Sequence, residues 1–201
     1  MATHKKMPSI HASRGQVRII GGKWRGRRLS IAPQAALRPS PDRVRETLFN
    51  WLAPYLSAAH CLDLFAGTGV LGLEAVSRGA ASATLLEGDP LVVKFLRRHI
   101  HMLDANNVTV IEYDVCKWLR DTVVDPFDIV FLDPPFGQGY VEIVLQELVR
   151  GWLKNPSWVY IEAEKIPILH FAADGWRLVN HGQTRQVHFA LIGYNPKQTN
   201  S

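Results

Sequence analysis

The sequence predicts an α/β fold in which a seven-stranded, mostly parallel sheet ends in an antiparallel hairpin, preceded by a small N-terminal β-hairpin. Three observations predict this class. Five apolar runs of strand length alternate with helix-like segments, which is typical of βαβ units and of a parallel sheet covered on both faces. Two further strand-like runs follow each other with only a turn between them. Two glycine-punctuated runs precede the first helix, and a chain of 201 residues accommodates one such domain with a small appendage.

The N-terminal part carries the positive charge of the chain. Residues 1–45 contain 11 Lys/Arg and a single acid, Asp42, whereas the remaining 12 Lys/Arg are accompanied by 17 acids. We expect residues 1–16 to form a disordered basic arm, with an organellar targeting segment as the alternative; the apolar stretch of a secretory signal is missing. A basic segment on an acidic domain favours a polyanionic partner, although a solvated tail has the same composition.

Residues 17–53 are expected to form a basic β-hairpin and a linking helix. The runs 17–20 and 28–31 are strand-like, and glycines at 21, 22 and 26 separate them. From Pro41, with Asp42 close to the N-cap position, apolar residues recur at helical spacing, so the helix is expected to end near Pro54.

Residues 54–195 are expected to form the main domain. Its strands are predicted at 61–65, 83–87, 108–112, 128–132 and 158–162, and its helices around 70–78, 90–103, 115–121 and 140–153. The runs 176–179 and 186–192 are predicted to form the closing antiparallel hairpin. The longest apolar runs are only strand-length, so no membrane span is expected.

A glycine loop follows the first of these strands. Gly67-Thr-Gly69-Val-Leu-Gly72 opens a predicted helix, and Glu87 closes the next strand, which matches the Rossmann-like fingerprint for dinucleotides, with an acid for the ribose. A nicotinamide oxidoreductase is therefore one interpretation. Asp63 disfavours it, because a carboxylate beside the loop would repel a pyrophosphate but attract the sulfonium and ammonium groups of S-adenosylmethionine. The same residues could instead form only a tight turn, with Glu87 a solvated strand end.

Asp114 and Val115 follow the third strand of the domain. The Asp114 carboxylate could accept a hydrogen bond from an adenine amine while apolar neighbours pack on the ring. An Asp in this position is equally typical of a helix cap, and the sequence leaves both interpretations open.

The fourth strand ends in Leu132-Asp133-Pro134-Pro135-Phe136. Two prolines fix the backbone, so a carboxylate, rigid carbonyls and an aromatic ring are held together. Asp133 and the Pro134 carbonyl could accept the two hydrogens of an exocyclic base amine, and Phe136 could stack on an extruded base. Beside a glycine loop suited to S-adenosylmethionine, this predicts an amino-methyltransferase site; by itself the tetrapeptide could be a rigid turn.

Together with the stretch 37–52, whose core is Arg-Pro-Ser-Pro-Asp-Arg-Val-Arg-Glu, these motifs make the chain similar to the bacterial RsmD family from about residue 15 to residue 193. The family is one of guanine-N2 methyltransferases acting on small-subunit ribosomal RNA. The resemblance implies a class I methyltransferase fold, S-adenosylmethionine as cofactor, guanine N2 as acceptor and an assembled small ribosomal subunit as partner. Ser40 stands where Thr is expected, which preserves the hydroxyl.

The expected site residues fall into three groups. The acceptor site is assigned to Asp133, Pro134, Pro135 and Phe136. The cofactor site is assigned to Asp63, Phe65, Gly67, Thr68, Gly69, Glu87, Asp114 and Val115. RNA binding is assigned to Arg18, Lys23, Arg25, Arg27, Arg28, Arg38 and Arg43.

Other functions are weighed against this one. An adenine-N6 methyltransferase acting on DNA or RNA would use the same turn, but the chain has no room for a module that reads the major groove. A non-catalytic RNA-binding assembly factor is disfavoured by the intact Asp133 and glycine loop. Cys61 and Cys116 have no metal-ligand spacing and no disulfide pattern, so we expect no metal and a cytoplasmic location.

Overall fold

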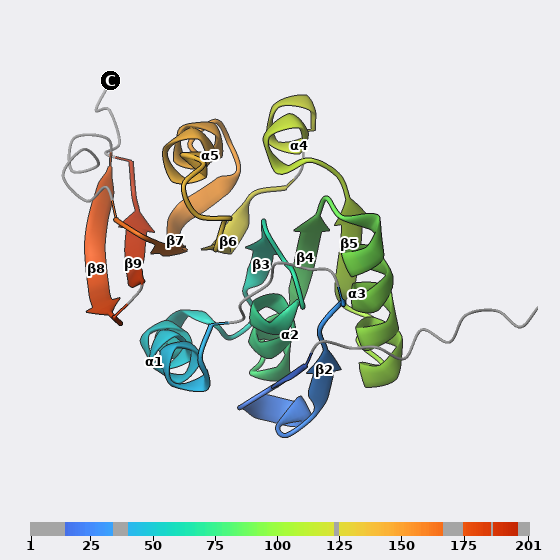
Figure 1. The fold of residues 1–201 in the computed structure, drawn as a ribbon. Coiled ribbons are helices and arrows are strands. Elements are labelled where there is room, and N and C mark those ends of the chain that lie inside the picture. The colour runs from blue at the N-terminus through green and yellow to red at the C-terminus, as the bar shows by residue number, and fades with distance from the viewer. Residues whose placement is uncertain (1–14, 34–39, 123–124, 167–174, 186, 197–201) are drawn as a thin grey trace, which may run out of the picture.

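The computed structural model describes residues 15–33, 40–122, 125–166, 175–185 and 187–196. Its larger sheet has the strand order β5-β4-β3-β6-β7-β9-β8 (Figure 1). Strands β3 to β7 pair in parallel, and β9 is antiparallel to both β7 and β8. The predicted sheet is thus confirmed, with β8 at its edge and β9 inside. The strands are β3 His60–Asp63, β4 Ser82–Glu87, β5 Val108–Glu112, β6 Phe127–Leu132, β7 Leu153–Ala163, β8 Trp176–Gln183 and β9 His188–Tyr194.

Helices cover both faces of this sheet. Figure 1 shows α4 (Val115–Asp121) and α5 (Tyr140–Leu148) on one side, and α1 (Asp42–Leu52), α2 (Val70–Ser77) and α3 (Pro90–Leu103) on the other. Of the described part of the chain, no helix is long and apolar enough to cross a membrane. The three-layer arrangement follows from the alternation of strands and helices in the sequence.

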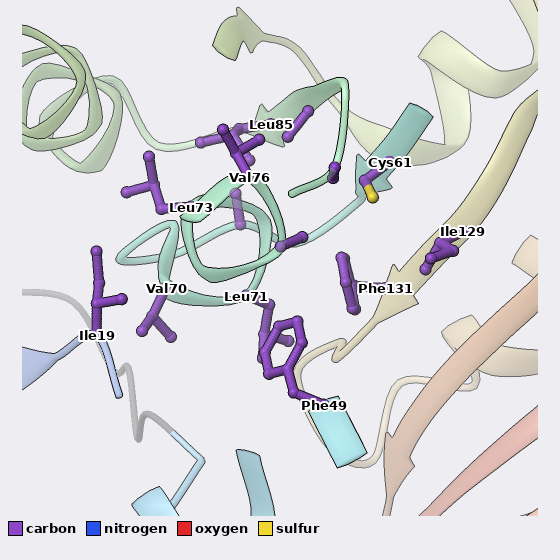
Figure 2. Packing of buried hydrophobic residues seen from close by; sticks show 14 of the residues in the cluster. Ile19, Phe49, Cys61, Val70, Leu71, Leu73, Val76, Leu85, Ile129 and Phe131 are labelled. Carbon is purple, nitrogen blue, oxygen red and sulfur yellow. The ribbon is translucent and has the colours of Figure 1, made fainter. Parts of the chain in front are cut away.

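The sheet divides most of the core into two large clusters. Alternate side chains of a strand point to opposite faces, so Cys61 belongs to one cluster and Leu62 to the other. The same holds for Phe131 and Leu132 of β6. Figure 2 shows the cluster around α2, in which Phe131 of the sheet lies near Phe49 of α1. Strands buried on both faces explain the continuous apolar runs of the sequence.

The N-terminal hairpin packs onto α2. It consists of β1 (Gln16–Arg18) and β2 (Arg28–Ser30), with a 3-10 turn, η1 (Gly22–Trp24), between them. Ile19 is fully buried in the same cluster as Val70 of α2, and both appear in Figure 2. The separation of 17–53 from 54–195 stays a prediction, but the hairpin shares the core of the main domain.

One predicted helix end differs from the structure, whereas both ends of α1 lie close to the expected positions. Helix α5 ends at Leu148 instead of continuing to residue 153, because Leu153 already pairs with Phe127 as the first residue of β7. The N-cap of α1 is Pro41, and Asp42 is its first helical residue. The helix ends at Leu52, near the expected position, and a 3-10 turn, η2 (Ala53–Tyr55), follows it.

Candidate functional site

The candidate site lies at the carboxyl edge of four adjacent strands, β4, β3, β6 and β7. Their ends carry Glu87, Asp63, Asp133 and Glu162 respectively. Ligands of open α/β sheets bind at this edge. The sheet order therefore brings together carboxylates that lie far apart in the sequence.

The glycine loop is tight because two of its glycines have no room for a side chain. Gly69 is the N-cap of α2 with φ +76°, a left-handed conformation in which a Cβ would also lie 2.6 Å from Leu96. A Cβ on Gly72 would lie 2.3 Å from Leu85. The Gly72 N–H donates a hydrogen bond of 3.1 Å to Asp63 Oδ2. The glycines thus let the first turn of α2 close onto the Asp63 carboxylate.

Asp63 is a buried carboxyl group, exposed to only 2%. Burial raises its pKa to about 7; the Gly72 hydrogen bond lowers the pKa and the charge of Glu87 raises it. A nearby cation would favour the ionised form. The sulfonium and ammonium groups of S-adenosylmethionine are such cations. The carboxyl groups beside the loop therefore fit this cofactor, whereas they would repel a pyrophosphate.

Glu87 anchors the loop from the neighbouring strand. Its Oε2 accepts a hydrogen bond of 3.0 Å from the Gly67 N–H, and its Oε1 accepts one of 2.9 Å from the Asp89 N–H. Each carboxylate oxygen can accept a second hydrogen bond, so the group can hold the loop and still bind ribose hydroxyls.

We expect Glu87→Ala to raise the cofactor dissociation constant by about ten- to a hundredfold, because charged hydrogen bonds contribute roughly 1.5–3 kcal/mol. Isothermal titration calorimetry measures the constant. The matched control is Glu112→Ala, since Glu112 is the register partner of Glu87 on β5 but is exposed. An unchanged constant in Glu87→Ala would leave Glu87 with no part in cofactor binding.

The other expected cofactor residues are distributed around the loop. Phe65 is partly buried and tilts against Tyr140 of α5, with ring centroids 5.2 Å apart. Thr68 is buried in the loop. Asp114 is the N-cap of α4, with its carboxylate accepting a 2.9 Å hydrogen bond from the Lys117 N–H, and Val115 is buried behind it. The capping interpretation of Asp114 is thus observed, whereas its contact with adenine stays a prediction.

The turn after β6 presents a carboxyl group and an aromatic face. Asp133 is partly exposed, Pro134 is buried, and Pro135 is exposed. Phe136 is 45% exposed, so its ring has a free surface. The pKa of Asp133 lies well above its usual value because of burial and then the charges of Glu162 and Asp63, while hydrogen bonding with Ser40 lowers it. One short turn thus presents a carboxyl group and an exposed aromatic ring.

Three buried polar side chains have no role assigned from the sequence. The Ser40 hydroxyl donates a 2.5 Å hydrogen bond to Glu162 Oε2, and the Tyr160 hydroxyl donates one of 2.9 Å to the same oxygen. All three side chains are buried. The available signal was Glu162 itself, an acid at the end of a predicted buried strand, as Glu87 is.

A second unassigned feature is a buried ion-pair network. Arg45 and Glu74 are both fully buried, and Arg45 Nη1 lies 3.0 Å from Glu74 Oε2. Arg45 Nη2 also lies 2.6 Å from Asp42, and Arg78 Nη2 lies 2.7 Å from Glu74 Oε1. The Ile20 N–H of the hairpin donates to Glu74. The network therefore joins the hairpin, α1 and α2, and part of the Arg-Pro-Ser-Pro-Asp-Arg-Val-Arg-Glu stretch serves packing.

The expected RNA-binding residues lie mainly on the exposed side of the hairpin. Arg18 pairs with Asp42 at 2.7 Å, and the Arg27 guanidinium donates to the Met102 carbonyl. Arg28 is 3.5 Å from the Gln16 side chain, and Lys23 lies 4.2 Å from the Trp24 ring centroid. Arg25 is exposed beside η1, and Arg43 is exposed on α1. Arg38 lies outside the described residues.

A hollow of about 410 Å³ lies between the hairpin and the start of α1. Arg18, Arg28, Ser40, Pro41 and Asp42 are among its lining residues. Since Ser40 also binds Glu162, this partly cationic hollow borders the acceptor site. Within the described ranges no group of three or more His, Cys, Asp or Glu side chains is arranged to hold a metal ion.

The chain is similar to known proteins over most of its length. The model of the family described as Conserved hypothetical protein 95 matches residues 17–193. Ribosomal RNA small subunit methyltransferase D of Escherichia coli (strain K12) is 44% identical over 182 residues, which cover 90% of this chain and 91% of that protein. The protein of the same name from Haemophilus influenzae is 41% identical, with 93% and 98% covered. The solved structure of the putative methyltransferase yhhF from Escherichia coli has a TM-score of 0.82 at 44% identity and covers 91% of this chain and 100% of that one.

Proposed function

The chain belongs to the RsmD family, that of ribosomal RNA small subunit methyltransferase D, and from this premise we propose that it methylates the exocyclic N2 amine of a guanine in small-subunit ribosomal RNA. The substrate is proposed to be an assembled small ribosomal subunit, which implies a cytoplasmic location. One observation carries the proposal: the glycine loop after β3 and the Asp133 turn after β6 lie on adjacent strands at one sheet edge. The residues proposed for the cofactor and those proposed for the acceptor are therefore neighbours.

S-adenosylmethionine is the proposed cofactor. When bound, it would supply a methyl group on a sulfonium, from which a neutral thioether is a good leaving group. Asp63 compensates its positive charge, and Glu87 binds the ribose hydroxyls. Gly67, Thr68 and Gly69 form the loop against which the amino-acid part lies. Phe65, Asp114 and Val115 surround the remainder. These residues need only bind and orient the cofactor.

The acceptor base is held by the turn after β6. The Asp133 carboxylate and the Pro134 carbonyl accept the two hydrogens of the amine, and Phe136 stacks on the extruded base, a contact worth roughly 1–3 kcal/mol. The amine of guanine is a poor nucleophile because its lone pair is delocalised into the ring, so orientation toward the methyl group contributes much of the acceleration. As the N–C bond forms, the nitrogen loses a proton, and the raised pKa of Asp133 makes its carboxylate a suitable acceptor.

The test is incubation of the protein with tritiated S-adenosylmethionine and small ribosomal subunits from a strain that lacks the enzyme, followed by digestion to nucleosides. We expect label in N2-methylguanosine. Label in N6-methyladenosine would replace the proposal by the adenine alternative. Tight RNA binding without label would favour the assembly factor. Naked rRNA in parallel reactions tests the preference for assembled particles.

RNA binding is proposed to occur through phosphate contacts of the hairpin, because exposed Arg and Lys side chains on a short turn supply charge but little base readout. We expect the double variant that combines Lys23→Gln with Arg25→Gln to bind RNA more weakly. The slope of log affinity against log salt concentration should fall by roughly 0.7–0.9 for each phosphate that is no longer neutralised. Fluorescence anisotropy at several salt concentrations measures both quantities. Point substitutions are needed because deletion of the hairpin would expose the core around Ile19.

The control for this variant is Lys117→Gln, which removes an exposed cation from α4, on the other face of the sheet (Figure 1). It should leave affinity and salt slope unchanged. Wild-type values in the hairpin variant would contradict the assignment of RNA binding to these two side chains.

A further inference from the structure

Glu162 is a buried carboxyl group to which the proposed reaction assigns no part. It lies near the end of β7, and in the parallel pairing Leu132 of β6 is opposite Ile161, so Asp133 and Glu162 are the next residues on adjacent strands. Glu162 is 5% exposed, whereas Asp133 is partly exposed. Because register neighbours on parallel strands point to the same face of the sheet, Asp133 and Glu162 lie side by side at its carboxyl edge.

Two hydroxyl groups fix Glu162 in place. Ser40 and Tyr160 both donate to its Oε2, at 2.5 and 2.9 Å. Tyr160 is fully buried on the same strand, and Ser40 precedes α1, 122 residues away in the chain. A carboxylate that accepts two buried hydroxyls has little rotational freedom, so its position relative to Asp133 is well defined.

We propose that Glu162, held by the Ser40 and Tyr160 hydroxyls, is a positioning residue that orients Asp133 for the base amine. The inference rests on the proposed function, since it assigns Glu162 a part in presenting the acceptor. Glu162 acts through Asp133 and does not touch the base. Ser40 is also one of the residues that line the hollow between the hairpin and the start of α1.

The charges around Asp133 fix the sign of the expected effects. Among the described residues, Glu162 and Tyr160 of β7, Asp63 of β3 and Ser40 before α1 interact with it. Burial raises the pKa of both carboxyl groups, and the negative charge of Glu162 raises that of Asp133 further. Hydrogen bonding with Ser40 lowers the pKa of both. Removal of the Glu162 charge should therefore move proton uptake to lower pH. Removal of the Ser40 hydroxyl should move the first proton uptake by the pair to higher pH.

The first experiment needs no substrate. Protein labelled with ¹³C at the Asp and Glu carboxyl carbons is titrated by NMR, with Asp133→Asn used to assign the Asp133 signal. We expect the midpoint of Asp133 to fall in Glu162→Gln, to rise in Ser40→Ala and to stay at the wild-type value in Ser40→Thr, which retains the hydroxyl. Glu164→Gln removes an exposed charge two residues beyond Glu162 and should change nothing. Unchanged midpoints in Glu162→Gln and Ser40→Ala overturn the proposal.

The second experiment measures methyl transfer to small ribosomal subunits as a function of pH. We expect Glu162→Gln to lower kcat by about ten- to a hundredfold with unchanged KM for both substrates, and to shift the acid limb of kcat/KM to lower pH. Ser40→Ala should shift that limb to higher pH, whereas Ser40→Thr should leave it unchanged. Comparison of these two variants tests the proposal even if Glu162→Gln does not fold. If the loss of activity in Glu162→Gln is fully explained by lower cofactor affinity and lower thermal stability, the proposal is overturned. Wild-type protein that methylates no guanine refutes the proposed function instead, while the NMR titration still tests the Asp133–Glu162 pair.

Discussion

Replacement of Asp133 by Ala is expected to reduce methyl transfer by about 10²–10⁴-fold, because it removes both the acceptor that orients the amine and the group that takes its proton. Cofactor affinity should change by no more than a few-fold, since Asp63, the glycine loop and Glu87 are retained. Single-turnover transfer of tritium measures the rate, and calorimetry measures the affinity.

Asp133→Asn is the matched variant for this experiment. The amide has the shape of the carboxylate but neither its charge nor its proton affinity, so it should lose most of the activity as well. The pKa of Asp133 lies well above its usual value mainly because of burial, which means that the folded protein disfavours the ionised form. Neither variant should therefore lower the melting temperature strongly. Turnover near the wild-type rate in Asp133→Ala would exclude Asp133 from the chemistry.

Replacement of Arg45 by Met is expected to destabilise the protein by about 3–5 kcal/mol, because it leaves a fully buried carboxylate without one of its partners. Met has a similar length and fills most of the space, so the loss reports the charge and not a cavity. Urea denaturation measures the free energy of unfolding. Arg43→Met, on an exposed position of the same helix, is the control and should change stability little.

The destabilisation should depend on pH with a defined sign. The pKa of Glu74 is raised by burial, while Arg78, Arg45 and the Ile20 N–H lower it. Without Arg45 it rises further, so folding of the variant binds a proton that the unfolded chain releases. Stability is then present below the unfolded-state pKa and is lost as pH rises through the folded-state pKa. Arg45→Met should consequently be closer to the wild type in stability at mildly acidic pH than at alkaline pH; an equal loss at both would contradict the buried-charge explanation.

The sequence determines the parts of the site in which neighbouring residues act together. The glycine loop depends on the spacing of Gly67, Gly69 and Gly72, and the acceptor turn on the two prolines after Asp133, so each is visible as a short motif. The alternation of buried runs with helices similarly predicts the sheet, and the turn between the last two runs predicts their antiparallel pairing. Confirmation of the sheet shows that these local patterns agree with the global fold.

Only the tertiary structure decides which distant residues share a surface. The sequence shows Arg45 in a basic stretch and suggests RNA contact for its neighbours, but the packing of α1 against α2 buries it beside Glu74. It shows Ser40 and Glu162 as unrelated positions. The order of β6 and β7 brings Glu162 next to Asp133, and the Ser40 hydroxyl donates a hydrogen bond to Glu162. The reason is physical. Periodicity and turn chemistry act over a few residues and are therefore visible in the sequence. A buried charge, in contrast, is tolerated only where a partner from elsewhere in the chain compensates it, and the tertiary structure decides which residue that partner is.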